Sequence, residues 1–328
     1  MSGRRSQSGV ALIMVLLAFA LGSIFATGMM SRQNLMIHRM GNYMTQSEAQ
    51  SLALGAEAFG RQILQRDWEQ DSQQENFIDH PGEDWAQYAV ALPVDAGAIE
   101  AQINDLQGRL NLNALVREDG QPNELMQERF ERLFAALDIR TVSVEALIDW
   151  IDENDQPTGA AGAEDGEYLR YNPAYRAANQ PFVHTSELRL MDGISEEDYR
   201  MLRPHVAALP DRTPELNVNF ATPAVIRSLH ERIGEAEAEA VFTATREEPF
   251  TEMQDFLARP EFSGLGLEDE GLGLRSYFFE VATRVTVSNN VQYLVSKVHR
   301  GEDGEIQVLS RDGSQTGIIT KETIQAPE

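Results

Sequence analysis

The feature that most constrains this chain is an uncharged apolar run close to its N-terminus. Val10 to Met30 are 21 residues without a charged side chain, behind a short leader that carries Arg4 and Arg5. At ~1.5 Å per helical residue, this run is long enough to cross the ~30 Å hydrocarbon core of a bilayer. A cleaved secretory signal has a shorter apolar region followed by a small-residue cleavage site. Here the run continues into polar sequence at Ser31, which predicts a membrane-spanning helix that stays on the protein.

A second helical segment is predicted directly after this run. From residue 31 to about residue 67, apolar side chains such as Leu35, Tyr43, Leu52 and Phe59 recur near the 3.6-residue period of a helix. An apolar stripe of this kind needs a partner surface. We therefore expect a β-sheet to cover the second half of a long helical spine.

Alternating, β-branched segments that predict strands occur in two places far apart in the chain. The predicted strands are residues 88–93, 98–105, 277–286, 291–299 and 306–310. Turn residues at Asn289-Asn290 and at 301–304 separate the last three, which is typical of hairpins. This order favours an antiparallel sheet built from two distant parts of the chain.

The long segment between these strands is predicted to be helical and to contain an internal repeat. The run Leu110-Asn111-Leu112-Asn113 returns in kind as Leu216-Asn217-Val218-Asn219. Each run is followed by helical sequence and later by a Phe, four further residues, an acid and an apolar residue, in 182–188 and 250–256. Asn side chains cap free backbone N–H groups at helix starts. We expect two similar helical subdomains.

These elements predict an α+β fold with a large helical insertion. The expected organisation is a leader at 1–9, a transmembrane helix at 10–30, a discontinuous α+β domain at 31–109 and 276–328, and an inserted all-α domain at 110–275. Within the insertion, subdomains are expected at about 110–210 and 211–275.

A dense group of acids marks the first half of the insertion. Seven acidic residues and no Lys or Arg lie between Asp149 and Glu167, in a stretch rich in Gly and Pro. Asp149 and Asp152 are three residues apart at the end of a helix predicted at 144–151, so their carboxylates share a face. Hard oxygen ligands in a flexible loop suit Ca²⁺ better than Zn²⁺. The spacing is not that of an EF-hand, because the sixth position from Asp152 is Pro157. A solvated acidic loop is the alternative interpretation.

Charge and composition argue against other function classes. The chain carries 52 acidic and 27 basic residues, a net charge of −25, and a surface this negative repels nucleic acid and anionic lipid. Its six histidines are scattered, and no P-loop or Gly-x-Ser-x-Gly spacing exists. We therefore expect no enzymatic activity. Cysteine is absent, which neither supports nor excludes an oxidising compartment.

The N-terminal pattern of polar leader, Gly9 and apolar helix resembles the class III leader of type IV pilins and type II secretion pseudopilins. That resemblance implies cleavage between Gly9 and Val10 by a prepilin peptidase, methylation of the new N-terminus, and a pilin-like fold for the spine and sheet. Most such proteins have Glu at the fifth mature position, where this chain has Met14. Loss of that Glu is typical of the K-type minor pseudopilin.

The insertion resembles the same K-type family. The run from Leu147 to Asp152, followed by Pro157 and Tyr168, is similar to the calcium loop of that family. The resemblance implies calcium as a structural cofactor. The implied ligands are Asp149, Asp152, Asp155, Glu164 and Asp165, with Asn154 and Glu167 as weaker candidates.

This resemblance implies a minor pseudopilin that initiates and caps the tip of a periplasmic pseudopilus, for export of folded proteins across the outer membrane. The implied partners are the I- and J-type minor pseudopilins in a tip complex, the major pseudopilin, the prepilin peptidase and the inner-membrane assembly platform. The implied location is the inner membrane of a Gram-negative cell, single-pass, with the N-terminus cytoplasmic and the C-terminal domain periplasmic.

Two other functions remain open at this stage. Asn217-x-Asn219 and the run 190–194 resemble helix-hairpin-helix and SAM-like modules, as in a membrane-anchored, competence-like DNA-binding protein. Ser195-Glu196-Glu197-Asp198 beside that run has the wrong charge for phosphate, so we expect the fold without nucleic acid. A metal-dependent hydrolase that uses Asp152 is the third hypothesis.

Overall fold

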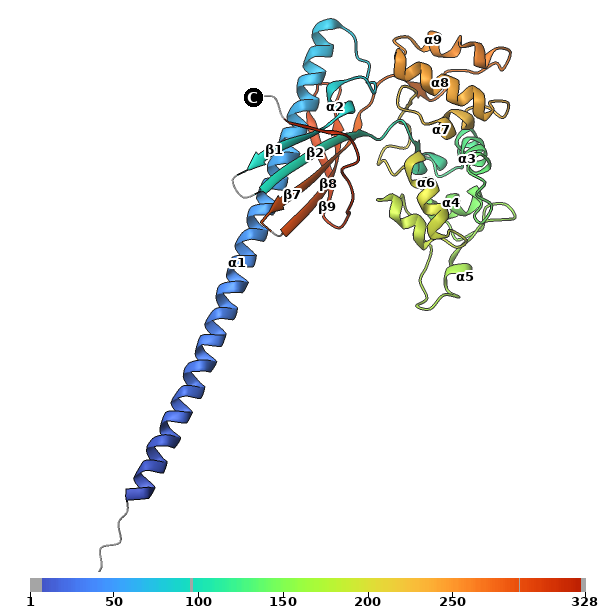
Figure 1. Ribbon diagram of the computed structural model, residues 1–328. Helices are drawn as coiled ribbons and strands as arrows, with labels where there is room; N and C mark the ends of the chain where they lie inside the picture. Colours follow the sequence, from blue (N-terminus) through green and yellow to red (C-terminus); the bar gives the residue numbers. More distant parts are fainter. Residues whose placement is uncertain (1–7, 95–96, 289, 326–328) are drawn as a thin grey trace, which may run out of the picture.

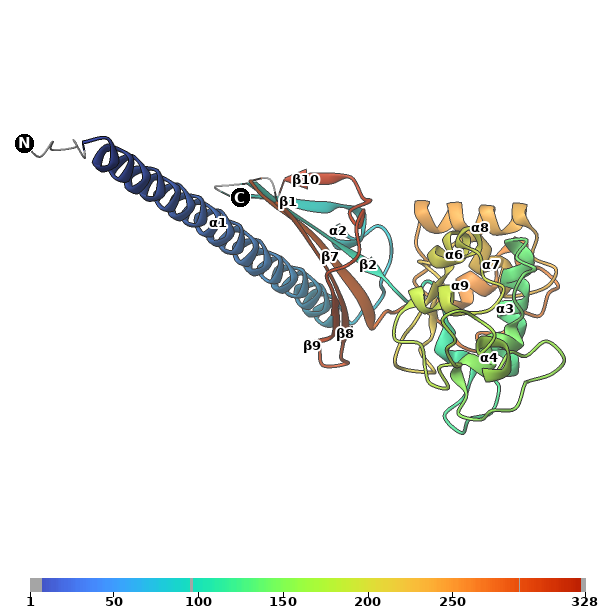
Figure 2. The ribbon, with the colours of Figure 1, turned by 90° about the horizontal axis from the view of Figure 1, so that it is seen from below.

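The computed structural model describes residues 8–94, 97–288 and 290–325. One long helix runs along a twisted sheet, and a separate group of short helices lies beside that sheet, at the level of the distal end of the long helix (Figures 1 and 2). Arg4 and Arg5 lie outside the described residues, as do the rest of the leader up to residue 7 and Asn289 of the predicted turn.

The bounds of the elements follow. The helices are α1 (Ser8–Gln74), α2 (Asp84–Gln87), α3 (Glu124–Ala136), α4 (Val144–Ile151), α5 (Asp165–Tyr168), α6 (Glu196–Leu202), α7 (Pro223–Ser228), α8 (Glu235–Glu247) and α9 (Met253–Leu257). The strands are β1 (Ala89–Val94), β2 (Gly97–Asp105), β3 (Leu110–Asn111), β4 (Val206–Ala207), β5 (Leu216–Asn217), β6 (Leu272–Gly273), β7 (Phe278–Val287), β8 (Asn290–Arg300), β9 (Ile306–Asp312) and β10 (Thr323–Gln325). Single 3-10 turns lie at Leu112–Leu115, Thr185–Leu190, Arg203–His205 and Pro260–Phe262.

Helix α1 is continuous over 67 residues, which corresponds to ~100 Å at ~1.5 Å per residue. It is long and apolar enough to cross a membrane, and the most apolar 18-residue window has a mean hydropathy of 2.5 and is not buried. The helix extends seven residues beyond the predicted end at about residue 67. Burial against the sheet begins only at Ala49.

The expectation that the sheet covers the whole second half of the spine is therefore wrong for its first part. Leu35, Ile37, Met40, Tyr43 and Met44 are all more than half exposed. The physical reason is length, because the strands of the sheet are at most 11 residues long and reach only the distal part of a 67-residue helix.

The sheet joins the two distant parts of the chain in the order β10-β1-β2-β7-β8-β9. Strand β2 pairs antiparallel with β7 over its full length, from Gly97 opposite Val287 to Asp105 opposite Phe279. This pairing sends the chain out of the sheet at Asp105 and returns it at Phe278. The segment between these two residues is the insertion. The sheet is antiparallel except at one edge, where β10, which the sequence did not predict, runs parallel to β1.

Small side chains on α1 allow it to pack closely on the sheet. Ala49, Ala53 and Ala56 are at most 2% exposed and lie against a patch that includes Ile99 and Val285. Further along, Leu64 packs into a second patch that contains Trp85, Ile103, Phe279, Val281 and Val298. Burial of this apolar surface supplies most of the favourable free energy of the contact.

One buried ionic contact fixes the register of α1 on the sheet. Glu57 is 1% exposed and accepts hydrogen bonds from Arg311 Nε at 2.6 Å and from Ser296 Oγ at 2.6 Å. Burial by itself would raise the pKa of Glu57, but the hydrogen bonds from Arg311 and Ser296 outweigh burial and lower it. The carboxylate is therefore held in its charged form.

The insertion consists of two helical units that repeat the same backbone arrangement. In each unit a two-residue strand at the start pairs in parallel with a two-residue strand at the end, β3 with β4 in the first and β5 with β6 in the second. In the first unit, Asn113 accepts a hydrogen bond from Phe182 N at 2.7 Å and donates one to Phe182 O at 2.9 Å. In the second, Asn219 makes the same two bonds with Phe250, both at 3.0 Å. The repeat predicted from sequence is therefore present as equivalent hydrogen bonds.

Candidate functional site

Helix α4 positions the first acid of the predicted calcium loop. Ser143 caps the start of α4, since its Oγ accepts a hydrogen bond from Ala146 N at 3.0 Å. Two residues before its end, the fully buried Asp149 accepts a hydrogen bond from Thr158 N at 2.8 Å. The other carboxylate oxygen, Oδ2, is buried and has no hydrogen-bond partner. A buried carboxylate oxygen without a partner is costly, so it indicates an absent ligand or a retained proton.

The chain then leaves the helix through Asp152 and turns back over Asp149. Asp152 is the C-terminal cap of α4, is 5% exposed, and accepts a hydrogen bond from Asn154 N at 3.2 Å. Burial and the nearby charge of Asp149 raise the pKa of Asp152, although the bond from Asn154 opposes this. Asp155 is exposed and accepts a hydrogen bond from Asn179 Nδ2 at 3.1 Å.

Glu164 is the most unusual acid of the loop. Its side chain belongs to a residue that is 6% exposed, and both of its carboxylate oxygens are buried without a hydrogen-bond partner. Burial raises its pKa to about 7, and the charges of Asp149, Asp152, Asp155 and Asp165 add to the rise. Glu164 therefore lies within electrostatic reach of four other predicted ligands.

The last two acids of the loop already have positive partners. Asp165 pairs with Arg176 at 2.8 Å and accepts a hydrogen bond from Ala177 N at 3.1 Å. Glu167 pairs with Arg170 at 2.5 Å, so its charge is already balanced without a metal ion. The predicted set thus divides into Asp149, Asp152 and Glu164, which are buried, and the remaining acids, which are more exposed and bonded to neighbours.

The chemistry of this loop suits a hard divalent cation, although among the described residues no three of its carboxylates bring one oxygen each within 4.8 Å of one another. Three buried oxygens, Asp149 Oδ2 and the two of Glu164, lack any partner, and the available donors are all oxygen. Ca²⁺ takes six to eight oxygen ligands from carboxylates, carbonyls and water, whereas thiolate or imidazole donors would indicate other metals. Gly162 supports the close packing, because a Cβ at this position would collide with Asp149 Oδ2.

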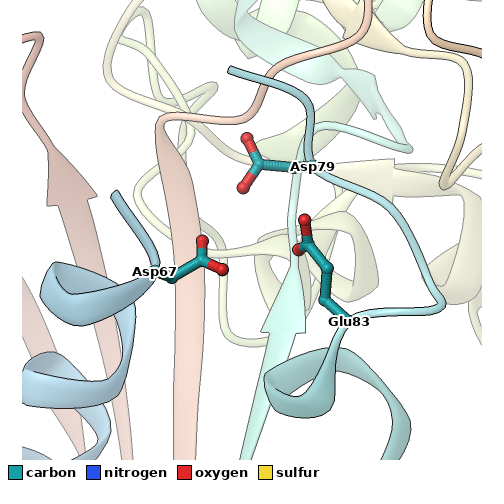
Figure 3. Close-up of side chains that lie close together, drawn as sticks. All are labelled: Asp67, Asp79 and Glu83. Atoms are coloured by element: carbon teal, nitrogen blue, oxygen red, sulfur yellow. The ribbon is translucent and has the colours of Figure 1, made fainter. Parts of the chain in front are cut away.

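A second group of acids was not predicted from the sequence. Of all the residues that the structure describes, only Asp67, Asp79 and Glu83 bring one carboxylate oxygen each within 4.8 Å of one another (Figure 3). They come from the end of α1, the loop after it and the residue before α2. Arg300 at the end of β8 donates to Asp67 at 2.9 Å and to both oxygens of Asp79 at 2.5 and 2.6 Å. No sequence spacing signals this group, and Arg300 joins it only because β8 lies beside α1.

The N-terminal residues singled out from sequence lie at the free end of α1. Gly9 and Val10 are in its first turn, and Met14 follows one turn after Val10. The side chains of Val10 and Met14 are 56% and 64% exposed. Val10 and Met14 are therefore exposed residues in the first turns of a helix that begins at Ser8.

The asparagines that suggested a nucleic-acid module have structural roles. Asn217 and Asn219 are buried, and their side chains bind Ser276, Phe250 and the backbone of Asp79. Ser195 and Asp198 form a capping box at the start of α6. These side chains are already used within the fold, so they do not favour the DNA-binding alternative.

Comparisons with known proteins follow the same division of the chain. A family profile described as "Type II secretion system (T2SS), protein K" matches residues 108–211, and a second of the same description matches residues 216–275. The chain is 38% identical to type II secretion system protein K of Pseudomonas aeruginosa, over 96% of this chain and 95% of that protein. It is 30% identical to the protein of that name from Aeromonas hydrophila, over 94% of this chain and 97% of the other.

One solved structure has the same fold. It is a chain of the GspK-GspI-GspJ complex from the type 2 secretion system of enterotoxigenic Escherichia coli, with a TM-score of 0.74 and 23% sequence identity. The match covers 85% of this chain and 100% of that chain.

Proposed function

The chain belongs to the type II secretion system protein K family, and we propose that it is the minor pseudopilin that initiates and caps the tip of a periplasmic pseudopilus. The observation that carries this proposal is the shape of the molecule. A pilin-like spine with an exposed half, Val10 to Met44, which begins with the apolar run Val10 to Met30, is joined to a bulky helical insertion beside the sheet (Figure 1). Such a subunit offers a helix for packing below it and an obstacle to any subunit added above it.

The proposed partners follow from this arrangement. The solved chain with the same fold comes from a complex with GspI and GspJ. We propose that this chain likewise assembles with I- and J-type minor pseudopilins, and that the major pseudopilin and the inner-membrane assembly platform contact the complex from below. The exposed apolar half of α1 is the surface that these helices would cover.

We also propose that a prepilin peptidase cleaves between Gly9 and Val10 and that the new N-terminus is methylated. The helix would then hold the protein in the inner membrane with the sheet and insertion in the periplasm. In pseudopilins with Glu at the fifth mature position, that carboxylate can pair with the N-terminus of a neighbour. Met14 cannot form such a pair, which fits a subunit with no predecessor above it.

The role that this assembly implies is structural and not enzymatic. The test is pseudopilus length in cells that overproduce the major pseudopilin, measured by electron microscopy with and without this chain. A capping subunit acts once per filament, so its production should shorten the filaments, and labelled copies should lie at one end. Unchanged lengths, with label along the filament, would refute the capping role.

We propose calcium as a structural cofactor of the insertion. Asp149, Asp152 and Glu164 would hold the ion, with Asp155 and Asp165 from the rim of the loop, and Asn154 and Glu167 as the weaker candidates. When bound, Ca²⁺ would supply the positive charge that the buried carboxylates of Asp149, Asp152 and Glu164 lack. The chain itself fixes the inner acids through α4, Thr158 and the close approach of Gly162. Trp150, one residue after Asp149, packs against Tyr168 and Phe182 in the core of the insertion. An ion that fixes the loop would therefore also stabilise this core.

Calcium titration of the full-length chain in detergent tests this cofactor. A ligand that binds only the folded state stabilises it by RT ln(1 + [L]/Kd), which is ~2.7 kcal/mol at a hundredfold excess over Kd. We expect a rise in Tm with Ca²⁺ and little with Mg²⁺, with affinity falling as the pH drops through about 7, where Glu164 takes up a proton. Glu164→Gln should abolish the rise, whereas the exposed neighbour Glu153→Gln should keep it. No rise in the unmodified chain would mean that the loop is a solvated acidic turn, and an equal rise in both variants would exclude Glu164 as a ligand.

A further inference from the structure

The junction between the pilin-like part and the insertion contains more buried acid than its one bonded cation can neutralise. Asp79 is fully buried, and Arg300, which donates to both Asp67 and Asp79, is 1% exposed. Glu83 completes the trio of carboxylates (Figure 3), but the bonds of the Arg300 guanidinium go to Asp67, Asp79 and Ser276 and not to Glu83. Its oxygen Oε2 is buried without a partner, and Oε1 lies 3.8 Å from His80 Nε2.

The other charged groups around Glu83 do not restore the balance. From α1, Asp71 adds a further negative charge to the field at Glu83. From the loop, His80 offers little charge, because burial lowers its pKa. From the segment before β7, Arg275 acts on Asp71 and lies over the rings of Phe77 and Tyr277, so it is not bonded to the trio. Asp105 at the end of β2 is a further buried acid within reach of Asp79.

We propose that this junction retains a proton between Glu83 and its neighbouring carboxylates at neutral pH, and that loss of this proton loosens the attachment of the insertion to the pilin-like part. A protonated carboxyl has an O–H that can donate to a nearby carboxylate, which removes one negative charge and satisfies an otherwise unpartnered oxygen. Burial, followed by the charges of the neighbouring acids, raises the pKa of Glu83 and of Asp67 well above the usual range.

A proton fits this junction better than a metal ion does. The guanidinium of Arg300 already uses one oxygen of Asp67 and both oxygens of Asp79. A divalent cation at the centre of the trio would lie close to that positive charge and would have to displace these bonds. A proton on a carboxyl neutralises the surplus without either cost.

The cluster is placed where a change in charge reaches both parts of the chain. Asp79 N donates to Leu274 O at 2.9 Å, and Asp79 Oδ2 accepts from Ser276 N at 2.7 Å, so the chain returning from the insertion is tied to it. The carbonyl of Asp79 also accepts a hydrogen bond at 3.1 Å from Asn217 of the second helical unit. Repulsion among ionised carboxylates would therefore weaken bonds that hold α1, β8 and the insertion together.

The test is the pH dependence of unfolding of the full-length chain in detergent, with calcium kept saturating so that the acidic loop does not titrate. A carboxyl whose pKa is raised on folding contributes stability that is fully present below its unfolded pKa and is lost as the pH rises through its folded pKa. For each proton retained, the unfolding equilibrium constant of the unmodified chain should rise by up to about tenfold per pH unit between these values.

Glu83→Gln places a neutral amide where the proton is held. We expect this variant to be more stable than the unmodified chain at pH 8 and to show a flatter pH dependence. The control Glu302→Gln, in the exposed turn between β8 and β9, should behave like the unmodified chain. An unchanged pH slope in Glu83→Gln would overturn the proposal.

Two further measurements do not depend on the stability of the variant. In the unmodified chain, infrared difference spectra across the same pH range should show a protonated carboxyl C=O band that Glu83→Gln lacks; absence of this band at pH 7 would refute the retained proton. If Mg²⁺, Mn²⁺ or Zn²⁺ stabilised the chain through a site lost in Glu83→Gln but kept in Glu164→Gln, the junction would hold a metal instead.

Discussion

Asn113→Ala should be among the most destabilising single substitutions in the insertion. The side chain of Asn113 is fully buried and makes three hydrogen bonds to backbone groups distant in sequence. It accepts from Phe182 N at 2.7 Å and donates to Phe182 O at 2.9 Å and Leu209 O at 2.8 Å. Alanine removes all three partners at once and leaves one backbone N–H and two carbonyls unpaired in the core.

The magnitude follows from these three groups. Each buried polar group left without a partner costs about 1–3 kcal/mol. If some of them find water in the space vacated by the amide, the total is on the order of 3–5 kcal/mol, a large part of the ~5–15 kcal/mol that stabilises an ordinary domain. For a unit of this size, a change of 1 kcal/mol shifts Tm by ~2–4 °C, so we expect a fall of roughly 6–20 °C.

The assay is denaturant unfolding of the full-length chain in detergent, followed by tryptophan fluorescence. Trp150 is the one tryptophan of the insertion, and its ring stacks on Phe182 with centroids 6.3 Å apart. Asn123→Ala is a matched control, because Asn123 accepts one hydrogen bond, from Met126 N at 3.4 Å, as the cap of α3. That cap should contribute about 1 kcal/mol. If Asn113→Ala costs no more than Asn123→Ala, the repeated asparagine does not hold the unit together and our reasoning is refuted.

Two further predictions concern the spine and the acidic loop. Glu57→Gln removes a carboxylate whose pKa is lowered on folding. Its contribution to the free energy of unfolding is present above its unfolded pKa and is lost as the pH falls through its folded pKa. In thermal unfolding, the variant should therefore be less stable than the unmodified chain at pH 7 and equally stable at acid pH. Gly162→Ala should push the backbone away from Asp149, because the added Cβ would collide with its Oδ2. Isothermal titration should then show calcium affinity weaker by roughly tenfold, equivalent to about 1.4 kcal/mol. An unchanged affinity would contradict the proposed contact.

The fold was predictable where a local pattern sets the structure. The bounds of α4 follow from Ser143 as cap and from an apolar run that ends at Asp152, and they agree with the prediction of 144–151. The strands at both ends of the chain were predicted to within one or two residues, except for β10, which is three residues long and exposed. A strand that short has no alternation for a sequence pattern to reveal.

The position of the acidic loop in the chain was predictable, but the arrangement of its carboxylates was not. Sequence alone grouped its seven acids, because they are adjacent in the chain. Only the tertiary structure divides them, since Arg176 approaches Asp165 and Glu164 is folded inward without a partner. The pair of Glu167 with Arg170 has the i, i+3 spacing of a helix, but the other two arrangements depend on how the loop packs and leave no local signal.

The sequence by itself determined a helix long and apolar enough to cross a membrane, the α+β class, the repeat in the insertion and the acidic loop, because each depends on residues that are neighbours along the chain. Only the tertiary structure decided how far the sheet covers α1, which loop oxygens lack partners, and that Asp67, Asp79, Glu83 and Arg300 meet. That last group joins residues up to 233 positions apart in the chain. Their electrostatic coupling depends on distances of a few ångströms, which are set only when β8 packs beside α1.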